Sequence, residues 1–144
     1  MATIEKTKIT VTATINAPVE KVWSLWTDPR HIVHWNNAQD DWHTTNAEND
    51  LRVGGKFLSR MEARDGSTGF DFEGEYTRVI LLKQIVYTLG DGRIVQVSFT
   101  ENGKETLVAE TFEAEQTYTP ELQKQGWQAI LNNFKKYVEN KTIS

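Results

Sequence analysis

The side chains with the greatest capacity for metal chemistry lie between residues 31 and 43. They are His31, His34, Asp40, Asp41 and His43. Imidazole and carboxylate groups are zinc ligands, so this group could in principle hold that metal. The spacing matches no recognised metal signature, however, and two histidines three residues apart on a short helix are commonly solvated. We therefore expect no metal site here.

Acid–base chemistry would need a titratable side chain that faces a cavity and has a shifted pKa. The polar side chains that could face inward are Arg60, Glu75, Tyr76, Tyr87 and Glu110. Because charged side chains on strands usually lie on the solvated face, we expect the charged members of this set to point outward. The sequence contains no Ser–His–Asp order, phosphate loop or paired-carboxylate motif. It therefore predicts no catalytic residue and no cofactor.

Large aromatic side chains are the third feature with chemical consequences. Such rings line cavities that bind apolar small molecules, but they also fill ordinary protein cores. Helical spacing assigns Trp23 and Trp26 to the core, whereas both interpretations stay open for most of the others. The candidate ligand-cavity residues are Trp35, Trp42, Phe57, Met61, Phe72, Tyr76, Tyr87, Phe99, Trp127, Ile130 and Phe134.

The composition excludes several classes of protein. A chain of 144 residues is expected to form one domain, and the absence of cysteine excludes disulfides, zinc-finger spacing and thiol catalysis. A net charge of −4 argues against nucleic acid as a partner. The longest aliphatic run, residues 79–82, is too short to span a membrane, and the first ten residues lack the apolar stretch of a signal peptide. We therefore expect a cytoplasmic protein with no membrane partner.

Two kinds of hydrophobic periodicity position these side chains. Residues 4–15 alternate between apolar and polar types, which predicts a half-buried strand. Apolar residues between 19 and 26 then recur at helical spacing, after a cap at residue 16 or 17. The pair Asp28-Pro29 ends this helix and begins a second one, which runs to about Trp35.

Three pairs of Asp-Gly or Asn-Gly, at 65–66, 91–92 and 102–103, predict tight hairpins. Glycine supplies the positive φ that such turns need. Consecutive hairpins make an antiparallel meander rather than a parallel sheet. The expected strands cover about residues 39–46, 53–64, 69–80, 84–90, 93–101 and 104–114.

A long amphipathic helix is expected at residues 120–139, with Thr119 as its cap and a length of roughly 30 Å. The predicted fold is therefore α+β: a curved antiparallel sheet of about seven strands wrapped on a long C-terminal helix, with two short helices between the first and second strands. A straight helix cannot fill a curved sheet evenly. We expect either a cavity or a zone of large aromatic side chains between them.

Two glycines bear on this arrangement. Gly74 could form a bulge and change which face of its strand points inward. Gly126 lies in the middle of the terminal helix, where glycine costs about 1 kcal/mol relative to alanine. We interpret Gly126 as a point of close contact between helix and sheet; room for a bound ligand is the alternative.

Four short motifs resemble those of one known protein family, and the match covers about residues 7–140. Residues 17–23 with Asp28-Pro29 resemble its opening APxExVW and DP element. Residues 50–57 resemble DxRxGGxF, residues 72–76 resemble FxGxY, and residues 126–131 resemble GWxxxL. The family is the activator-of-heat-shock-protein-90-ATPase-like family, within the START-like, Bet-v-1-like or polyketide cyclase superfamily. The resemblance implies the helix-grip fold, in one domain over residues 1–144.

The same resemblance implies a range of roles rather than one. Members of the superfamily carry hydrophobic ligands, act as cyclases or dehydratases, or associate with chaperones, and the family is not known for metal. In the eukaryotic activators this module follows an N-terminal domain that contacts the chaperone, and we expect no such domain before the first strand here. We therefore expect a chaperone to be a less favoured partner. The loop of Asp50, Arg52, Gly54 and Gly55 is expected to be structural and to lie near the mouth of a cavity.

We expect a small domain that binds an apolar or amphipathic small molecule between the sheet and the terminal helix. A cyclase- or hydrolase-like enzyme in the same cavity is an alternative, and it predicts an inward ionisable residue with a shifted pKa. An interaction module is a third class, one that works with a chaperone, as in a stress response, or forms a homodimer. It predicts an exposed apolar patch and a cavity too small for a ligand.

Overall fold

The computed structural model describes residues 7–38 and 40–141. Within them, one strand, two short helices, six strands and a long helix follow in the order expected from the sequence. These elements are β1 (Lys8–Ile15), α1 (Val19–Thr27), α2 (Pro29–Trp35), β2 (Trp42–Asn49), β3 (Lys56–Ala63), β4 (Gly69–Ile80), β5 (Gln84–Leu89), β6 (Ile94–Asn102), β7 (Glu105–Glu113) and α3 (Pro120–Asn140).

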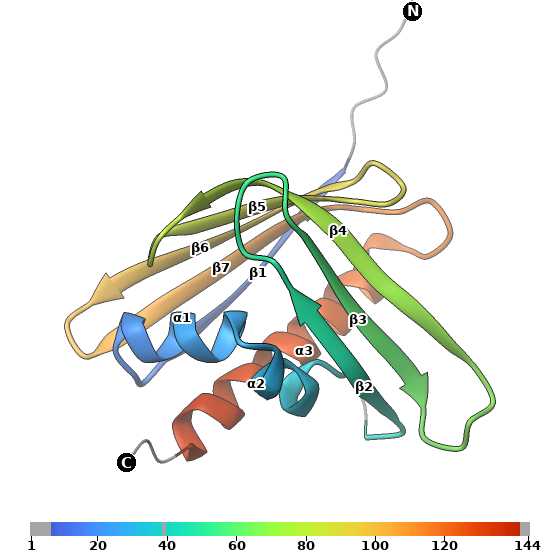
Figure 1. Cartoon of the computed structure of the whole chain (residues 1–144), viewed down its shortest axis with the longest axis horizontal. Coiled ribbons are helices and arrows are strands. Elements are labelled where there is room, and N and C mark those ends of the chain that lie inside the picture. Colours follow the sequence, from blue (N-terminus) through green and yellow to red (C-terminus); the bar gives the residue numbers. More distant parts are fainter. Residues whose placement is uncertain (1–6, 39, 142–144) are drawn as a thin grey trace, which may run out of the picture.

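The seven strands form one antiparallel sheet in the order β1-β7-β6-β5-β4-β3-β2. The sheet curls, and α3 crosses its concave face (Figure 1). The chain passes from one edge strand, β1, to the other, β2, through α1 and α2. The expected α+β helix-grip fold is therefore confirmed.

The turn chemistry explains why the meander forms. Gly66, Gly92 and Gly103 adopt φ values of +77°, +92° and +66°, as the three hairpin pairs predicted. Strand bounds differ from the expected ones by up to three residues. The expected starts of the first two strands, at residues 4 and 39, lie outside the described residues.

The helix caps agree with the sequence in two cases of three. The Asp28 carboxylate accepts a hydrogen bond from the Arg30 N–H at 2.9 Å, and the Thr119 hydroxyl accepts one from the Leu122 N–H at 3.2 Å. The cap expected at residue 16 or 17 is wrong. Pro18 itself is the cap of α1, with an extended ψ of 155° and no side-chain hydrogen bond.

Gly74 does not form a bulge. It pairs in regular register with Phe57 of β3 and with Leu89 of β5, and the irregularity of β4 lies between Tyr76 and Arg78. A Cβ atom at Gly74 would lie 2.8 Å from Cε1 of Phe57 and 2.8 Å from the carbonyl oxygen of Thr88. This glycine therefore allows the Phe57 ring to lie across the strand.

The helices are fixed to the two edges of the sheet. On α3, Gln128 donates to the Thr12 carbonyl at 3.0 Å and Lys135 donates to the Thr14 carbonyl at 2.7 Å, both on β1. At the opposite edge, the hydroxyl of Thr44 on β2 donates to the Asn36 carbonyl, at the end of α2, at 2.7 Å. The C-terminal half of α3 then closes against the short helices.

The close packing expected at Gly126 is wrong. A Cβ atom built there meets nothing within 4 Å, apart from the helix's own backbone and its chain neighbours. The N-terminal half of α3 therefore leaves free space beside this residue. No helix among the described residues is long and apolar enough to cross a lipid bilayer.

Candidate functional site

A cavity of about 330 Å³ lies between the concave face of the sheet and α3. Eight of the candidate residues are on its wall: Trp35, Phe57, Met61, Phe72, Tyr76, Tyr87, Trp127 and Ile130. These residues lie on α2, β3, β4, β5 and α3. The curled sheet, the short helix α2 and the long helix α3 therefore all contribute to the wall of one cavity.

Three of the candidate residues are not on this wall. Phe134 is fully buried, and its ring packs edge-on against Trp26 and Trp35 at centroid distances of 4.9 and 4.8 Å. Phe99 packs in the same manner against Trp23 at 5.1 Å. These rings fill the end of the seam between sheet and helices, so they belong to the core. Trp42, on the edge strand β2, instead contacts Phe70 at 5.8 Å.

Trp26 lies both in the packed core and on the cavity wall. The sequence assigned it to the core, and its ring does stack on Trp35 at 4.9 Å, but it also lines the cavity. It therefore forms the boundary between the filled end of the seam and the open part.

Ring contacts make the wall rigid. Trp127 of α3 stacks on Phe112 of β7 with centroids 3.9 Å apart and planes 10° from parallel. On the other side, Phe57 packs edge-on against Tyr87 at 4.8 Å and lies 5.7 Å from Phe72. Aromatic pairs of this kind each contribute roughly 0.5–1.5 kcal/mol beyond the area that they bury. The cavity is thus held open by packed rings rather than by loose side chains.

Glu110 is a charged side chain that faces inward. Its position on a strand predicts the solvated face, and this prediction is wrong, because Glu110 lines the cavity and is only 6% exposed. Val108 and Phe112, two residues away on β7, share its buried face. Burial raises the pKa of the Glu110 carboxyl to about 8. No hydrogen bond or ion pair between described residues involves this carboxyl group.

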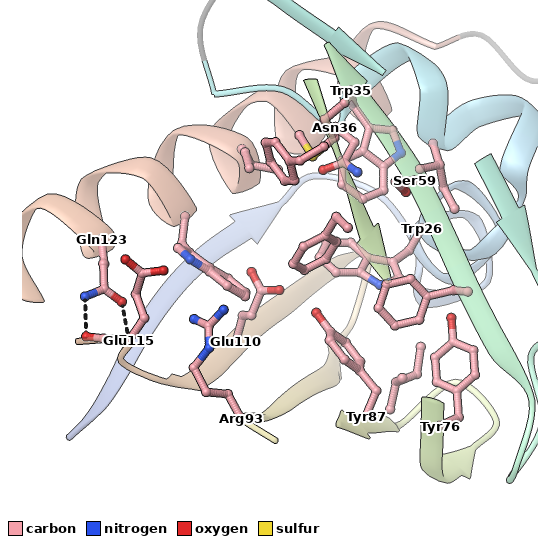
Figure 2. A pocket seen from close by; sticks show the side chains of 18 of the residues that line it. Trp26, Trp35, Asn36, Ser59, Tyr76, Tyr87, Arg93, Glu110, Glu115 and Gln123 are labelled. Carbon is pink, nitrogen blue, oxygen red and sulfur yellow. Dashed lines mark hydrogen bonds between the residues drawn. The ribbon is translucent and has the colours of Figure 1, made fainter. Parts of the chain in front are cut away.

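Two tyrosines face the same space. Burial is the main cause, and the charge of Glu110 the second, that raises the pKa of Tyr87 well above its ordinary value. Glu110 and Tyr87 are therefore electrostatic neighbours. Burial also raises the pKa of Tyr76, whose hydroxyl donates to the side-chain oxygen of Asn49. Both phenols are therefore neutral at physiological pH, and Figure 2 shows the Tyr87 hydroxyl and the Glu110 carboxyl directed into the cavity.

Arg93 and Glu115 complete the polar part of the wall (Figure 2). Arg93 follows the Asp91-Gly92 turn, and its Nε donates to the Asp91 carboxylate at 2.7 Å. Oε1 of Glu115 is buried and has no hydrogen-bond partner. Beside it, Gln123 of α3 accepts from the Glu115 N–H at 2.8 Å and donates to the Tyr118 carbonyl at 2.7 Å, which fixes the loop between β7 and α3.

Strand parity could have found several of the residues that the candidate set omitted. Ser59 alternates with Phe57 and Met61, and Ile85 precedes Tyr87 by two positions on β5. Residues in turns and loops give no such periodic signal. The further wall residues outside the candidate set are Ile32, Asn36, Glu48, Phe70, Arg93, Glu115, Tyr118 and Gln123.

The histidine and aspartate group has a different role. His31 is half-buried, and its Nδ1 lies 2.7 Å from the hydroxyl oxygen of Tyr137 on α3. The ring of His34 stacks on the same tyrosine at 5.9 Å. These contacts join α2 to α3. Among the described residues, no group of three or more His, Asp or Glu side chains could hold a metal ion.

The loop between β2 and β3 supports the wall without lining it. The Gly54 N–H donates to the Tyr76 carbonyl at 2.8 Å, and the Tyr76 N–H donates to the Gly55 carbonyl at 2.9 Å. Arg52 pairs with Asp50 at 3.0 Å across the turn. The loop therefore extends the pairing with β4 and fixes the position of Tyr76.

The comparison with known families is decisive for residues 16–139. This range matches the family model described as Activator of Hsp90 ATPase homolog 1-like protein. The chain belongs to that family. No protein of curated function matches it.

Solved structures from bacteria agree with this membership in the Activator of Hsp90 ATPase homolog 1-like family. The solution structure of the AHSA1-like protein from Aeromonas hydrophila is 45% identical, covers 96% of this chain and 99% of that chain, and has a TM-score of 0.87. The solution structure of Chr148 from Cytophaga hutchinsonii is 50% identical, covers 92% of each chain, and has a TM-score of 0.81. The crystal structure of CV1439 from Chromobacterium violaceum, at 22% identity over 94% of this chain and 99% of that one, has a TM-score of 0.84 and shares the fold.

Proposed function

We propose that this protein binds an amphipathic small molecule in the cavity between the sheet and α3. The supporting observation is the cavity itself: about 330 Å³, with a wall that combines aromatic rings and polar side chains. Small-molecule sites commonly have volumes of about 300–1,000 Å³ and this combination of apolar walls with few polar groups. Phe70 and Tyr118 are the exposed aromatic residues of the wall.

A fluorescence titration tests this proposal. N-phenyl-1-naphthylamine is a neutral apolar probe that becomes fluorescent in an apolar environment, and we expect saturable binding of one probe per chain. Phe72→Trp should weaken probe binding at least about tenfold, because the larger ring would project into the cavity beside Phe57 and Trp127. The unfolding midpoint should change little, because Phe72 is half-buried and borders free space.

A matched substitution outside the cavity controls for the added indole. Leu81→Trp places the same side chain on a residue that is 70% exposed, and it should leave probe affinity unchanged. Unfolding of Phe72→Trp would make Phe72 a packing residue, whereas equal losses of affinity in both variants would show that the effect of the indole is not specific to the cavity. A wild-type protein that binds no probe would contradict the proposal and favour an interaction module.

One observation favours a second candidate function. Glu110 is an inward ionisable residue with a raised pKa, which the enzyme alternative requires, and a carboxyl group with a pKa of about 8 can act as a general acid or base near neutral pH. Incubation of a metabolite extract with the wild-type protein and with Glu110→Gln, followed by mass spectrometry, would test it. A product formed by the wild type alone supports catalysis.

A further inference from the structure

The charged side chains of the cavity wall are mostly acidic. They are Glu48, Arg93, Glu110 and Glu115. The positive charge of Arg93 is already compensated, because its Nε lies 2.7 Å from the carboxylate of Asp91 in the β5–β6 turn. Glu48 lies at the exposed part of the wall, whereas Glu110 is 6% exposed. The deeper polar part of the cavity would therefore repel an anion once Glu110 is ionised.

Two carboxyl groups in this part of the wall are open to a donor that a ligand supplies. Glu110 lines the cavity and takes part in no hydrogen bond or ion pair between the described residues, and Oε1 of Glu115 is buried without a partner among them. A buried polar atom without a hydrogen bond costs free energy, and a buried carboxylate costs much more. A donor that enters with a ligand would remove this cost, and a positively charged donor would remove most of it.

The rings around Glu110 suit a cation as well. Trp127 stacks on Phe112, which shares the buried face of β7 with Glu110, and Tyr87 is an electrostatic neighbour of Glu110. Figure 2 shows Tyr87, Arg93 and Glu110 around the same space. The negative faces of indole and phenol rings attract ammonium groups, most strongly where water is excluded.

We infer that the ligand is an amphipathic amine: an apolar body that lies among the aromatic rings, with one protonated nitrogen held by the carboxylate of Glu110. This inference rests on the proposed function and specifies the class of small molecule. The ammonium N–H groups donate to Glu110, and Glu115 is the second acceptor near the polar end of the cavity.

Binding of such a ligand is coupled to a proton. The empty cavity holds Glu110 mainly in its protonated form at pH 7, since its pKa is about 8, and the ammonium group displaces that proton. The titratable or charged groups that face the cavity with it are Glu48 on β2, Tyr76 on β4, Tyr87 on β5, Arg93, Glu115 and Tyr118. The wall residues of α1, α2 and α3 are not titratable between pH 6 and 8. Affinity for the amine should therefore rise between these pH values.

Three probes that share one skeleton test the inference: 4-phenylbutylamine, 4-phenylbutanol and 4-phenylbutyrate. Binding of each probe is measured at pH 6 and pH 8, by calorimetry or by the fluorescence of the wall tryptophans. The alkylamine stays protonated at both pH values because its pKa lies near that of lysine, about 10.4. At pH 8 we expect the amine to bind about tenfold or more tightly than the alcohol, and the carboxylate to bind most weakly. From pH 6 to pH 8 the affinity for the amine, and for no other probe, should rise at least about fivefold.

Glu110→Gln should reduce the affinity for the amine to that for the alcohol, remove the pH dependence and leave alcohol binding unchanged. Glu105→Gln, on the exposed side of the same strand, removes the same charge outside the cavity and should change none of these values. If the variant does not fold, the three-probe series on the wild-type protein still decides the question.

Different results would contradict the inference and the proposed function. Tight binding of the alcohol or the carboxylate, with no preference for the amine, would overturn the inference and leave the proposed function intact. Absence of binding by all three probes would overturn the inference, and absence of N-phenyl-1-naphthylamine binding as well would overturn the proposed function too.

Discussion

At the scale of single residues, Glu110 is a carboxyl group whose surroundings oppose its charge. It lies on β7 opposite Val97 of β6, on the face shared with Val108 and Phe112. Burial there favours the protonated carboxyl, and no described residue compensates the charged form with a hydrogen bond. Strongly shifted groups in cavities are candidates for function because a residue selected for stability alone would be apolar at this position.

The pH dependence of stability tests the burial of Glu110. Its pKa is about 8 in the folded protein and near 4.5 in an unfolded chain, so the folded state holds an extra proton between these values. The free energy of unfolding should therefore fall as pH rises from 5 to 8, by up to about 1.4 kcal/mol per pH unit from this group. Glu110→Gln removes this contribution, so its stability relative to wild type should grow with pH. Urea denaturation at several pH values measures both.

Glu105→Gln serves as the control, because Glu105 is exposed on the same strand. Identical pH slopes for the wild type and Glu110→Gln would show that Glu110 is charged and solvated in the folded state. That result would also remove the basis for a proton-coupled site.

At the scale of elements, the sequence predicted most of what depends on local signals. The Asp-Gly and Asn-Gly pairs predicted the hairpins, and helical periodicity predicted α3 within one residue of its observed end at Asn140. The sequence named Phe57, Phe72 and Tyr76 as candidate cavity residues, and all three line the cavity.

The remaining features depend on contacts between distant elements. Whether Phe134 fills the seam or lines a cavity is decided by Trp26 and Trp35, which pack on it from α1 and α2. Glu110 points inward because it lies on the same face of β7 as the buried residues Val108 and Phe112. This alternation is visible in the sequence, but the expectation that charged side chains face solvent predicts the opposite direction. Arg93 and Glu115 reach the cavity from a turn and a loop, which have no periodicity to read.

Two glycine substitutions distinguish free space from close packing at the element scale. Gly126→Ala should stabilise the protein by up to about 1 kcal/mol, because alanine is the better helix former and its Cβ would meet no atom within 4 Å. Gly74→Ala should destabilise it by about 1–3 kcal/mol, because its Cβ would collide with the Phe57 ring and the Thr88 carbonyl.

Chemical denaturation of both variants and the wild type measures these changes. A destabilised Gly126→Ala would mean that the open space beside Gly126 does not exist in solution. A neutral Gly74→Ala would mean that the Phe57 ring is free to move away from the strand.

At the scale of the whole molecule, a curled sheet and a straight helix meet along a seam that side chains fill at one end. Rings from α1, α2, β6 and the C-terminal half of α3 pack solidly there. Towards the N-terminal half of α3 the seam opens into the cavity, walled by Trp127 and by rings from β3, β4 and β5. One end of the seam therefore stabilises the fold, and the other end can hold a ligand.

The central claim is that this cavity, rather than an outer surface, is the binding site. Intermolecular NOEs between bound N-phenyl-1-naphthylamine and the isotope-labelled protein test it most directly. We expect NOEs from probe protons to Phe72, Tyr87 and Trp127, whose side chains line the cavity. NOEs confined to exposed side chains such as Val53 and Leu81, with none to the cavity rings at saturating probe, would contradict it.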